Sequence, residues 1–253
     1  MPQQKFAVVG AGGGAGKACV DTLLQKGLHV RAVVRDPQKA EATFAGQSGA
    51  TSTLKDVTVK ERLELVKGDV TDPESLKAAL AGCKGVVFAA SGRGYWSADS
   101  VDFKGVKNVA DAAKELGGVE RVVVVSSALV TPKNRFHPVR ILLNNIRWGL
   151  MDAKLKGEDY LRKSGVPYTI VRPGGLSNDA PGQVRLVAEQ GDKGSPGRIS
   201  RADVAAVCCA ALTDPKARNV TLELAGKPWG QDEAKVQLAE QLKGLFQGLS
   251  PDQ

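Results

Sequence analysis

A glycine-rich stretch at residues 10–16 (GAGGGAG) constrains the fold more than any other feature of the sequence. It follows the short apolar run Phe6–Val9, which is typical of a strand buried on both faces. Residues 17–25 then carry apolar side chains at helical spacing and stop at Gly27. The sequence therefore predicts a strand, a tight glycine turn and a helix in succession.

The glycines of this turn suit a phosphate group. Gly10 permits the tight turn, Gly13 lets the backbone approach a pyrophosphate, and Gly16 allows close packing of helix on strand. The free N–H groups and the positive dipole end of the helix attract phosphate. A flexible glycine turn without a ligand is the alternative, but the position between strand and helix favours a dinucleotide.

Strand and helix patterns alternate along the rest of the chain. The predicted strands are 5–9, 28–35, 63–66, 85–90, 121–126, 168–172 and 219–224, and the predicted helices are 17–25, 38–44, 73–80, 101–116, 152–163, 201–212 and 232–245. This alternation indicates parallel pairing through right-handed crossovers, hence an α/β protein with a doubly wound parallel sheet. We expect one domain, 1–253, in which 174–253 adds a small substrate lobe over the strand ends. The polar stretch 46–58 looks the least ordered.

The end of the second predicted strand bears on the choice between NAD and NADP. NAD enzymes place Asp or Glu there to bind the ribose hydroxyls. Here the strand ends at Arg35, with no acidic residue before it. A guanidinium suits a 2′-phosphate, with Lys17 or Arg31 in support, whereas the alternative makes Asp36 the ribose ligand. The sequence favours NADP over NAD.

The charge balance indicates an anionic partner. Lys+Arg 35 against Asp+Glu 27 give a net charge of +8. The basic residues are dispersed and accompany no aromatic RNA-binding motif, which argues against nucleic acid. Four cysteines without CxxC spacing and only two histidines argue against a disulfide framework and a metal site. The sequence contains no run of 18 apolar residues, so it predicts no transmembrane helix. No signal peptide is expected before the first strand.

Several motifs together resemble one family. They are the glycine loop, 30–37 (VRAVVRDP), 68–72 (GDVTD), Ser126-Ser127, 168–176 (YTIVRPGGL) and 199–205 (ISRADVA). The chain resembles the atypical short-chain dehydrogenase/reductases with an NAD(P)H-binding, NmrA-like domain. Within them it is similar to the plant and cyanobacterial branch that includes chloroplast import-associated, NADPH-binding proteins. The resemblance implies a Rossmann fold and a location in the chloroplast stroma, with the cytoplasm as the alternative.

The resemblance also implies which residues bind the dinucleotide. Asp69 would accept a hydrogen bond from the adenine amine, and residues 173–176 would border the nicotinamide. The alternative makes Asp69 a turn cap and the residues after the fourth strand a plain loop. The expected cofactor-binding residues are Gly10, Ala11, Gly12, Gly13, Gly14, Ala15, Gly16, Arg35, Asp69, Val70, Ala89, Ala90, Ser91, Ser126, Lys154, Pro173, Gly174, Gly175 and Leu176.

The catalytic residues depart from the family's pattern. Short-chain dehydrogenases use Ser, Tyr and Lys, with Tyr-x-x-x-Lys on one helix so that the ammonium depresses the phenol pKa. No tyrosine of this chain has a lysine four residues later, and Leu150 precedes Lys154 at that spacing. Ser127 matches the catalytic serine. Ser127 and Lys154 are therefore the expected catalytic pair, and the alternative makes Lys154 an exposed helix lysine.

Residues 135–151 combine apolar side chains with arginines. Such a segment fits a protein partner or an anionic membrane surface. The alternative is that it packs inward over the active site, which Tyr95 and Trp96 would also face.

Two functions stay open. One is an NADP-dependent oxidoreductase of unknown small-molecule substrate, such as a quinone or a flavin, because the missing phenol argues against ordinary carbonyl reduction. The other is a non-catalytic, NADPH-sensing binding or assembly factor.

Overall fold

The computed structural model describes residues 4–45, 61–192, 197–230 and 233–252. Within these ranges ten strands form one sheet in the order β3-β2-β1-β4-β5-β6-β10-β9-β7, with β8 paired to β10. The strands are β1 (Lys5–Val9), β2 (His29–Val34), β3 (Leu63–Lys67), β4 (Gly85–Phe88), β5 (Arg121–Val125), β6 (Tyr168–Pro173), β7 (Gly175–Ser177), β8 (Arg185–Glu189), β9 (Arg198–Ser200) and β10 (Val220–Lys227). The helices are α1 (Gly14–Gln25), α2 (Pro37–Ala45), α4 (Pro73–Leu80), α5 (Lys104–Leu116), α6 (Pro138–Ile146), α7 (Leu150–Lys163), α8 (Arg201–Ala211) and α9 (Leu238–Gly244).

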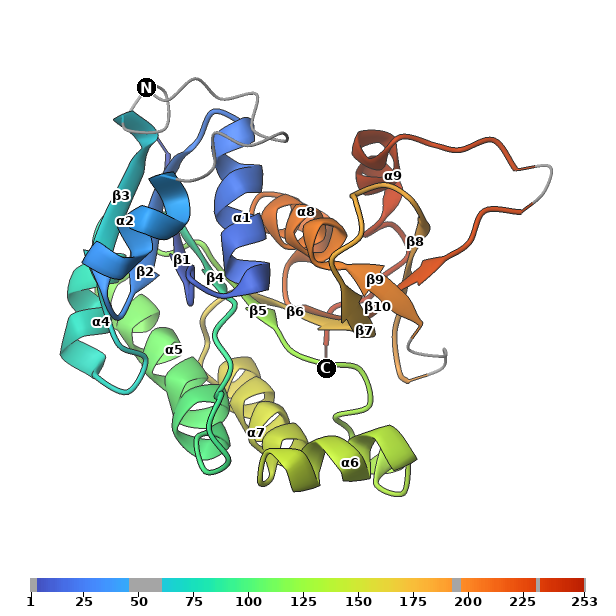
Figure 1. Cartoon of the computed structure of the whole chain (residues 1–253), viewed down its shortest axis with the longest axis horizontal. Helices are drawn as coiled ribbons and strands as arrows, with labels where there is room; N and C mark the ends of the chain where they lie inside the picture. The colour runs from blue at the N-terminus through green and yellow to red at the C-terminus, as the bar shows by residue number, and fades with distance from the viewer. Residues whose placement is uncertain (1–3, 46–60, 193–196, 231–232, 253) are drawn as a thin grey trace.

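The predicted doubly wound parallel sheet is confirmed. Each neighbouring pair in the spatial series β3-β2-β1-β4-β5-β6-β10 is parallel. In the described part of the sheet, β8 and β9 pair with β10 in the antiparallel direction. Figure 1 shows α1 and α8 side by side on one face of this sheet and α4, α5 and α7 on the other. The carboxyl ends of the parallel strands meet at one edge, which is where such sheets bind ligands.

The two faces of β1 explain its unbroken apolar sequence. Phe6 and Val8 enter the core beneath α1 and α8, whereas Ala7 and Val9 enter the core beneath α4 and α5. Successive side chains of a strand point to opposite faces, so a central strand covered on both sides needs apolar residues at every position.

The C-terminal part differs most from the sequence prediction. The helix predicted over 232–245 is shorter, since α9 covers only Leu238–Gly244. Residues 233–237 are all exposed, and no buried face stabilises a helix there. The sequence does not predict β7, β8 and β9, because runs of three to five residues carry too little periodicity. The stretch 46–58 lies outside the described residues.

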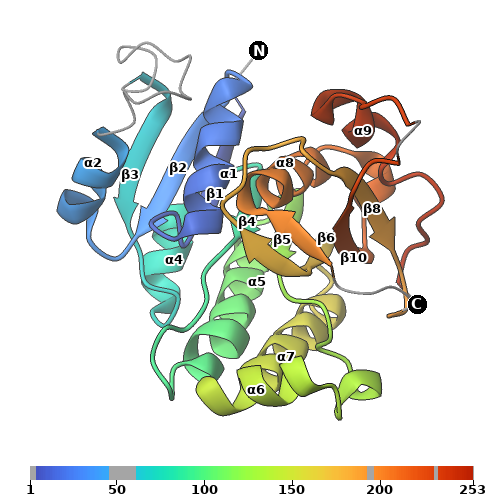
Figure 2. The ribbon, with the colours of Figure 1, turned by 45° about the vertical axis from the view of Figure 1, so that its right-hand side comes forward.

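The described residues of the predicted lobe, 174–192, 197–230 and 233–252, divide between the main body and its edge. From this region α8 packs on α1 and β10 joins β6, whereas β7, β8 and β9 gather around β10 (Figures 1 and 2). The substrate lobe over the strand ends stays a prediction. All four cysteines are buried as free thiols. No helix within the described ranges is both long and apolar enough to cross a membrane.

Candidate functional site

The glycine turn joins β1 to α1 and leaves no space for a side chain at Gly10 or Gly16. Gly10 has a φ of +81°, and a Cβ on it would lie 2.6 Å from the backbone nitrogen of Ala90. A Cβ on Gly16 would lie 2.2 Å from the carbonyl oxygen of Gly10. At the start of α1 the N-cap is Gly13, which offers no side-chain acceptor to the first N–H groups. These groups are free to bind an anion.

The turn lies against the ends of the neighbouring strands. The N–H groups of Gly10 and Ala11 donate to the carbonyl oxygen of Val33 at 3.3 and 3.4 Å, and Ala89 donates to Val9 at 2.9 Å. The predicted residues at the ends of β1 and β4 are thereby brought together beside the end of β2.

Arg35 and Asp69 follow β2 and β3 at this same edge. The Asp69 carboxylate accepts the backbone N–H of Thr71 at 2.8 Å and its hydroxyl at 2.7 Å. These two hydrogen bonds, and the charge of nearby Arg35, hold the pKa of Asp69 below its usual range. Asp69 is therefore an ionised acceptor at neutral pH. Next to it, the carbonyl of Val70 accepts from the side chain of Asn108 at 2.8 Å.

Two residues of the β2 segment, Asp36 and Arg31, have hydrogen-bond partners within the protein. The Asp36 carboxylate accepts the backbone N–H of Lys39 at 3.0 Å and so caps α2. The prediction that Arg31 helps to bind a 2′-phosphate is wrong. Its guanidinium donates to Glu64 and to the carbonyls of Ala79 and Ala81, where α4 ends before β4 begins, and is thus held toward the amino end of the strands.

Lys154 on α7 reaches a buried carboxylate. Its Nζ lies 2.9 Å from Oδ1 of Asp102, whose Oδ2 accepts the N–H of Gly92 at 2.9 Å. Asp102 is buried in a π-helical turn, Asp99–Phe103, which replaces the first residues of the helix predicted over 101–116. The interpretation of Lys154 as an exposed lysine is wrong, because only 11% of its side chain is exposed. The hydroxyl of Ser91, the residue before Gly92, accepts from the Arg147 guanidinium at 3.4 Å.

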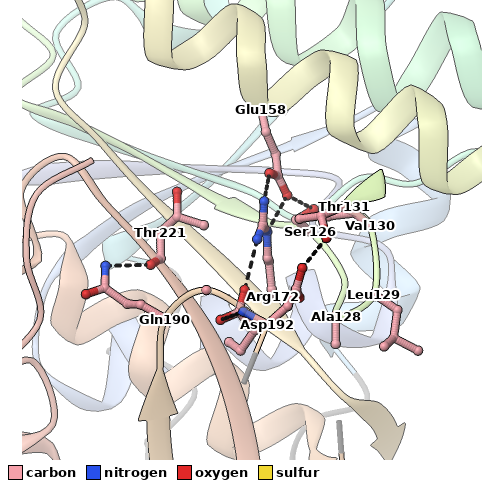
Figure 3. A network of polar contacts seen from close by, with 12 residues as sticks. Ser126, Ala128, Leu129, Val130, Thr131, Glu158, Arg172, Gln190, Asp192 and Thr221 are labelled. Atoms are coloured by element: carbon pink, nitrogen blue, oxygen red, sulfur yellow. Dashed lines mark hydrogen bonds and ion pairs between the residues drawn. The ribbon is translucent and has the colours of Figure 1, made fainter. Parts of the chain in front are cut away.

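The two serines after β5 have different partners. Ser126 is buried and donates at 2.5 Å to Glu158, which also accepts from Arg172 through two bonds of 3.1 and 2.6 Å (Figure 3). Glu158 accepts from Arg162 as well, at 2.9 Å. The Ser127 hydroxyl donates to the carbonyl of Ala128 at 3.1 Å. The hydroxyl of Ser126 is thus part of a buried ionic network, whereas among the described residues that of Ser127 bonds to the adjacent carbonyl alone.

Leu150, which stands four residues before Lys154, is buried against Ala98 and Ala153. The Tyr160 hydroxyl donates to Asp111 at 2.6 Å, and that hydrogen bond raises the pKa of Tyr160. Burial, together with the hydrogen bond to Asp252, raises the pKa of Tyr168. Both phenols are held in the protonated form.

The run 173–176 passes from β6 into β7. Ala128 donates to the carbonyl of Pro173 at 2.8 Å, which ties the run to the end of β5. Gly174 donates to Leu224 at 3.1 Å, and Leu176 pairs with Ile199 in β9. The run thus starts at the same sheet edge as the glycine turn.

Sequence reasoning missed Asp102 and Arg201. A Cβ on Gly14 would lie 2.9 Å from Cδ of Arg201 and 3.0 Å from its Nε, so this side chain crosses the start of α1. Its guanidinium donates to Asn178, a neutral partner, at 2.7 Å. Arg201 belongs to the ISRADVA motif, which signals the family without assigning the arginine a role. Asp102 has no sequence signal of its own.

The comparison with known proteins agrees with this geometry. A family model described as NAD(P)H-binding matches residues 10–215, from the glycine turn to just beyond α8. The chain belongs to this NAD(P)H-binding family. The glycine turn and the strand ends fit the dinucleotide that this family binds. The resemblance to the atypical short-chain dehydrogenase/reductases is confirmed as membership of an NAD(P)H-binding family.

Individual relatives cover most of the chain. An uncharacterised chloroplastic protein of Arabidopsis thaliana is 35% identical over 249 residues, covering 95% of this chain and 83% of the relative. Sanguinarine reductase of Eschscholzia californica is 29% identical, covering 83% of this chain and 96% of its own. A solved structure, a putative NAD-dependent epimerase/dehydratase from Bacillus halodurans, has a TM-score of 0.73 at 23% identity, covering 96% of this chain and 100% of that chain, and shares the fold.

Proposed function

We propose that the chain is an NADP(H)-dependent oxidoreductase of unknown small-molecule substrate that works without the usual tyrosine. The observation that carries the choice of NADP is the pair of residues after β2. Arg35 follows the strand, while Asp36, the alternative ribose ligand, is engaged in capping α2. A guanidinium suits the 2′-phosphate that distinguishes NADP from NAD.

The other residues suit the rest of the dinucleotide. The start of α1 and the guanidinium of Arg201 would hold the pyrophosphate, and ionised Asp69 would accept from the adenine amine. When bound, the nicotinamide supplies a hydride. Lys154, held by Asp102, would bind the adjoining ribose and supply a proton. Ser127 would orient the substrate. Quinones and flavins are suitable acceptors, because their reduction depends little on a phenolic acid.

Arg35→Ala is expected to weaken NADPH binding about tenfold to a hundredfold, since a hydrogen bond to a charged group contributes about 1.5–3 kcal/mol. NADH affinity should stay nearly unchanged. Isothermal titration with both nucleotides measures the two effects. Lys39→Ala removes another exposed cation nearby and serves as the control. An unchanged NADPH preference in Arg35→Ala would contradict the assignment.

Lys154→Met is expected to lower NADPH oxidation about 10²- to 10⁴-fold, the usual contribution of a general acid. The assay uses a panel of quinones, flavins and enones. The control is Lys156→Met, an exposed lysine on the same helix, and a thermal-shift measurement confirms that both variants are folded. Turnover by Lys154→Met at the wild-type rate would exclude this lysine from the chemistry.

A wild-type chain that is silent on the whole panel would favour the second candidate, an NADPH-sensing binding or assembly factor. That function predicts tight NADP(H) binding and a protein partner whose capture responds to the NADPH/NADP ratio. We place either function in the chloroplast stroma, in line with the chloroplastic relative.

A further inference from the structure

Helix α6 presents its apolar side chains outward. Leu142 and Ile146 are 56% and 57% exposed, and Val139 on the same face is also exposed. The face toward the protein carries the half-buried Leu143 and the buried Arg140. Arg140 donates to the carbonyls of residues 129–131 and pairs with Asp152. Helices of globular proteins normally have the opposite arrangement, so this face is built for contact with something apolar.

Exposed aromatic residues flank the helix at both ends. Phe136, just before α6, is 76% exposed. After the helix, Trp148 lies 5.7 Å from Trp96 and 6.2 Å from Tyr95 between ring centroids, and Trp96 is 74% exposed. The three rings of this cluster come from the loop after β4 and from the turn between α6 and α7. We call the outer face of α6 together with these aromatic residues the apolar face.

The charged residues within the segments that carry the apolar face are all cations. Arg93 and Arg135 are exposed beside its aromatic residues, and the Arg135 guanidinium lies 4.5 Å from the Phe136 ring centre. Arg147 adds a third cation. The stretches 84–98 and 121–151, which contain the whole apolar face, have no Asp or Glu. Two copies joined through this face would bring arginines together, which disfavours a symmetric dimer.

We propose that the apolar face docks on the surface of a membrane containing anionic lipids. Tryptophan and tyrosine favour the boundary between headgroups and acyl chains, and an amphipathic helix edged by arginines lies in that plane. Figures 1 and 2 show α6 at the margin of the molecule beside α7 and away from α1 and α8, where a flat surface can approach it.

The docked orientation would bring the candidate site close to the membrane. Trp148 stands six positions before Lys154 in the chain, and Arg147 donates to Ser91 at the end of β4. The inference does not depend on the proposed oxidoreductase function, because binding to lipid needs no turnover.

The test is flotation of the full chain with vesicles of phosphatidylcholine alone or mixed with phosphatidylglycerol. Wild type should float with the anionic vesicles, remain unbound with the neutral ones, and bind less as salt rises. Trp96→Ser/Ile146→Ser should weaken binding at least about tenfold through lost apolar burial. Arg93→Glu/Arg135→Glu should weaken it by a similar factor through lost attraction.

The matched control is Lys235→Glu/Val236→Ser, which changes an exposed cation and an exposed apolar residue far along the chain. It should float like the wild type. Thermal shift with NADPH checks that every variant is folded. Failure of the wild type to bind anionic vesicles, as expected of a face that docks only on another protein, would overturn the proposal. Equal binding by all variants would overturn it too.

Discussion

Glu158→Ala is expected to lower the free energy of unfolding by about 3–5 kcal/mol, the usual cost of removing one partner from a buried ion pair. Glu158 is 1% exposed and accepts from Ser126, Arg162 and Arg172. Burial acts to lower the pKa of Arg172, yet the hydrogen bonds and charges of Glu158 and Glu223 raise it overall. Without Glu158 two guanidiniums would lose their buried counter-ion.

Urea unfolding of the variant measures the loss. Asp159→Ala is the matched control, since this neighbouring carboxylate pairs with the same Arg162 from an exposed position. Exposed pairs contribute about 0–1 kcal/mol. An equal decrease in the free energy of unfolding for the two variants would show that the buried ion pairs of Glu158 add no more stability than an exposed pair.

Gly16→Ala is expected to cost about 1–3 kcal/mol of stability, as overpacking usually does, and to weaken NADPH binding at least about tenfold through displacement of the helix start. The new Cβ would lie 2.2 Å from the carbonyl oxygen of Gly10 and 2.8 Å from its carbon. Both are backbone atoms, so α1 itself has to move away from β1. The N–H groups at its start move with it.

Thermal unfolding and NADPH titration of the same preparation follow both effects. Gly244→Ala in α9 is the control, because nothing lies within 4 Å of the added Cβ. It should leave stability and binding unchanged or slightly improve stability. A Gly16→Ala protein that binds NADPH like the wild type would show that the phosphates are held elsewhere.

The fold and the glycine turn could be predicted because their signals are local. The run Phe6–Val9, the glycines and the helical spacing after them are neighbours in the sequence, and each limits the conformation of the next. The preference for Arg35 over Asp36 could be proposed for the same reason. It needed the structure to show that Asp36 caps α2.

The ionic pairs could not be predicted, because they join residues far apart in the chain. Asp102 looks like any acid of a helix until the π-helical turn directs it to Lys154. Glu158 meets Ser126 and Arg172 only after β5, β6 and α7 are assembled. Periodicity cannot report such contacts.

The orientation of α6 could be predicted only in part. The apolar side chains and the arginines of 135–151 were visible in the sequence, but which side faces the protein depends on Arg140 and its partner Asp152. Inward packing holds for Leu143 and Met151, which join Val130 in a small core. It is wrong for Leu142 and Ile146.

The central claim is that the site is built for a 2′-phosphorylated dinucleotide. Isothermal titration of the wild-type chain with NADPH and with NADH, at one salt concentration, tests it most directly. We expect NADPH to bind at least about tenfold more tightly, because Arg35 gains a charge-assisted bond only to the 2′-phosphate. Equal affinities, or tighter binding of NADH, would contradict the claim.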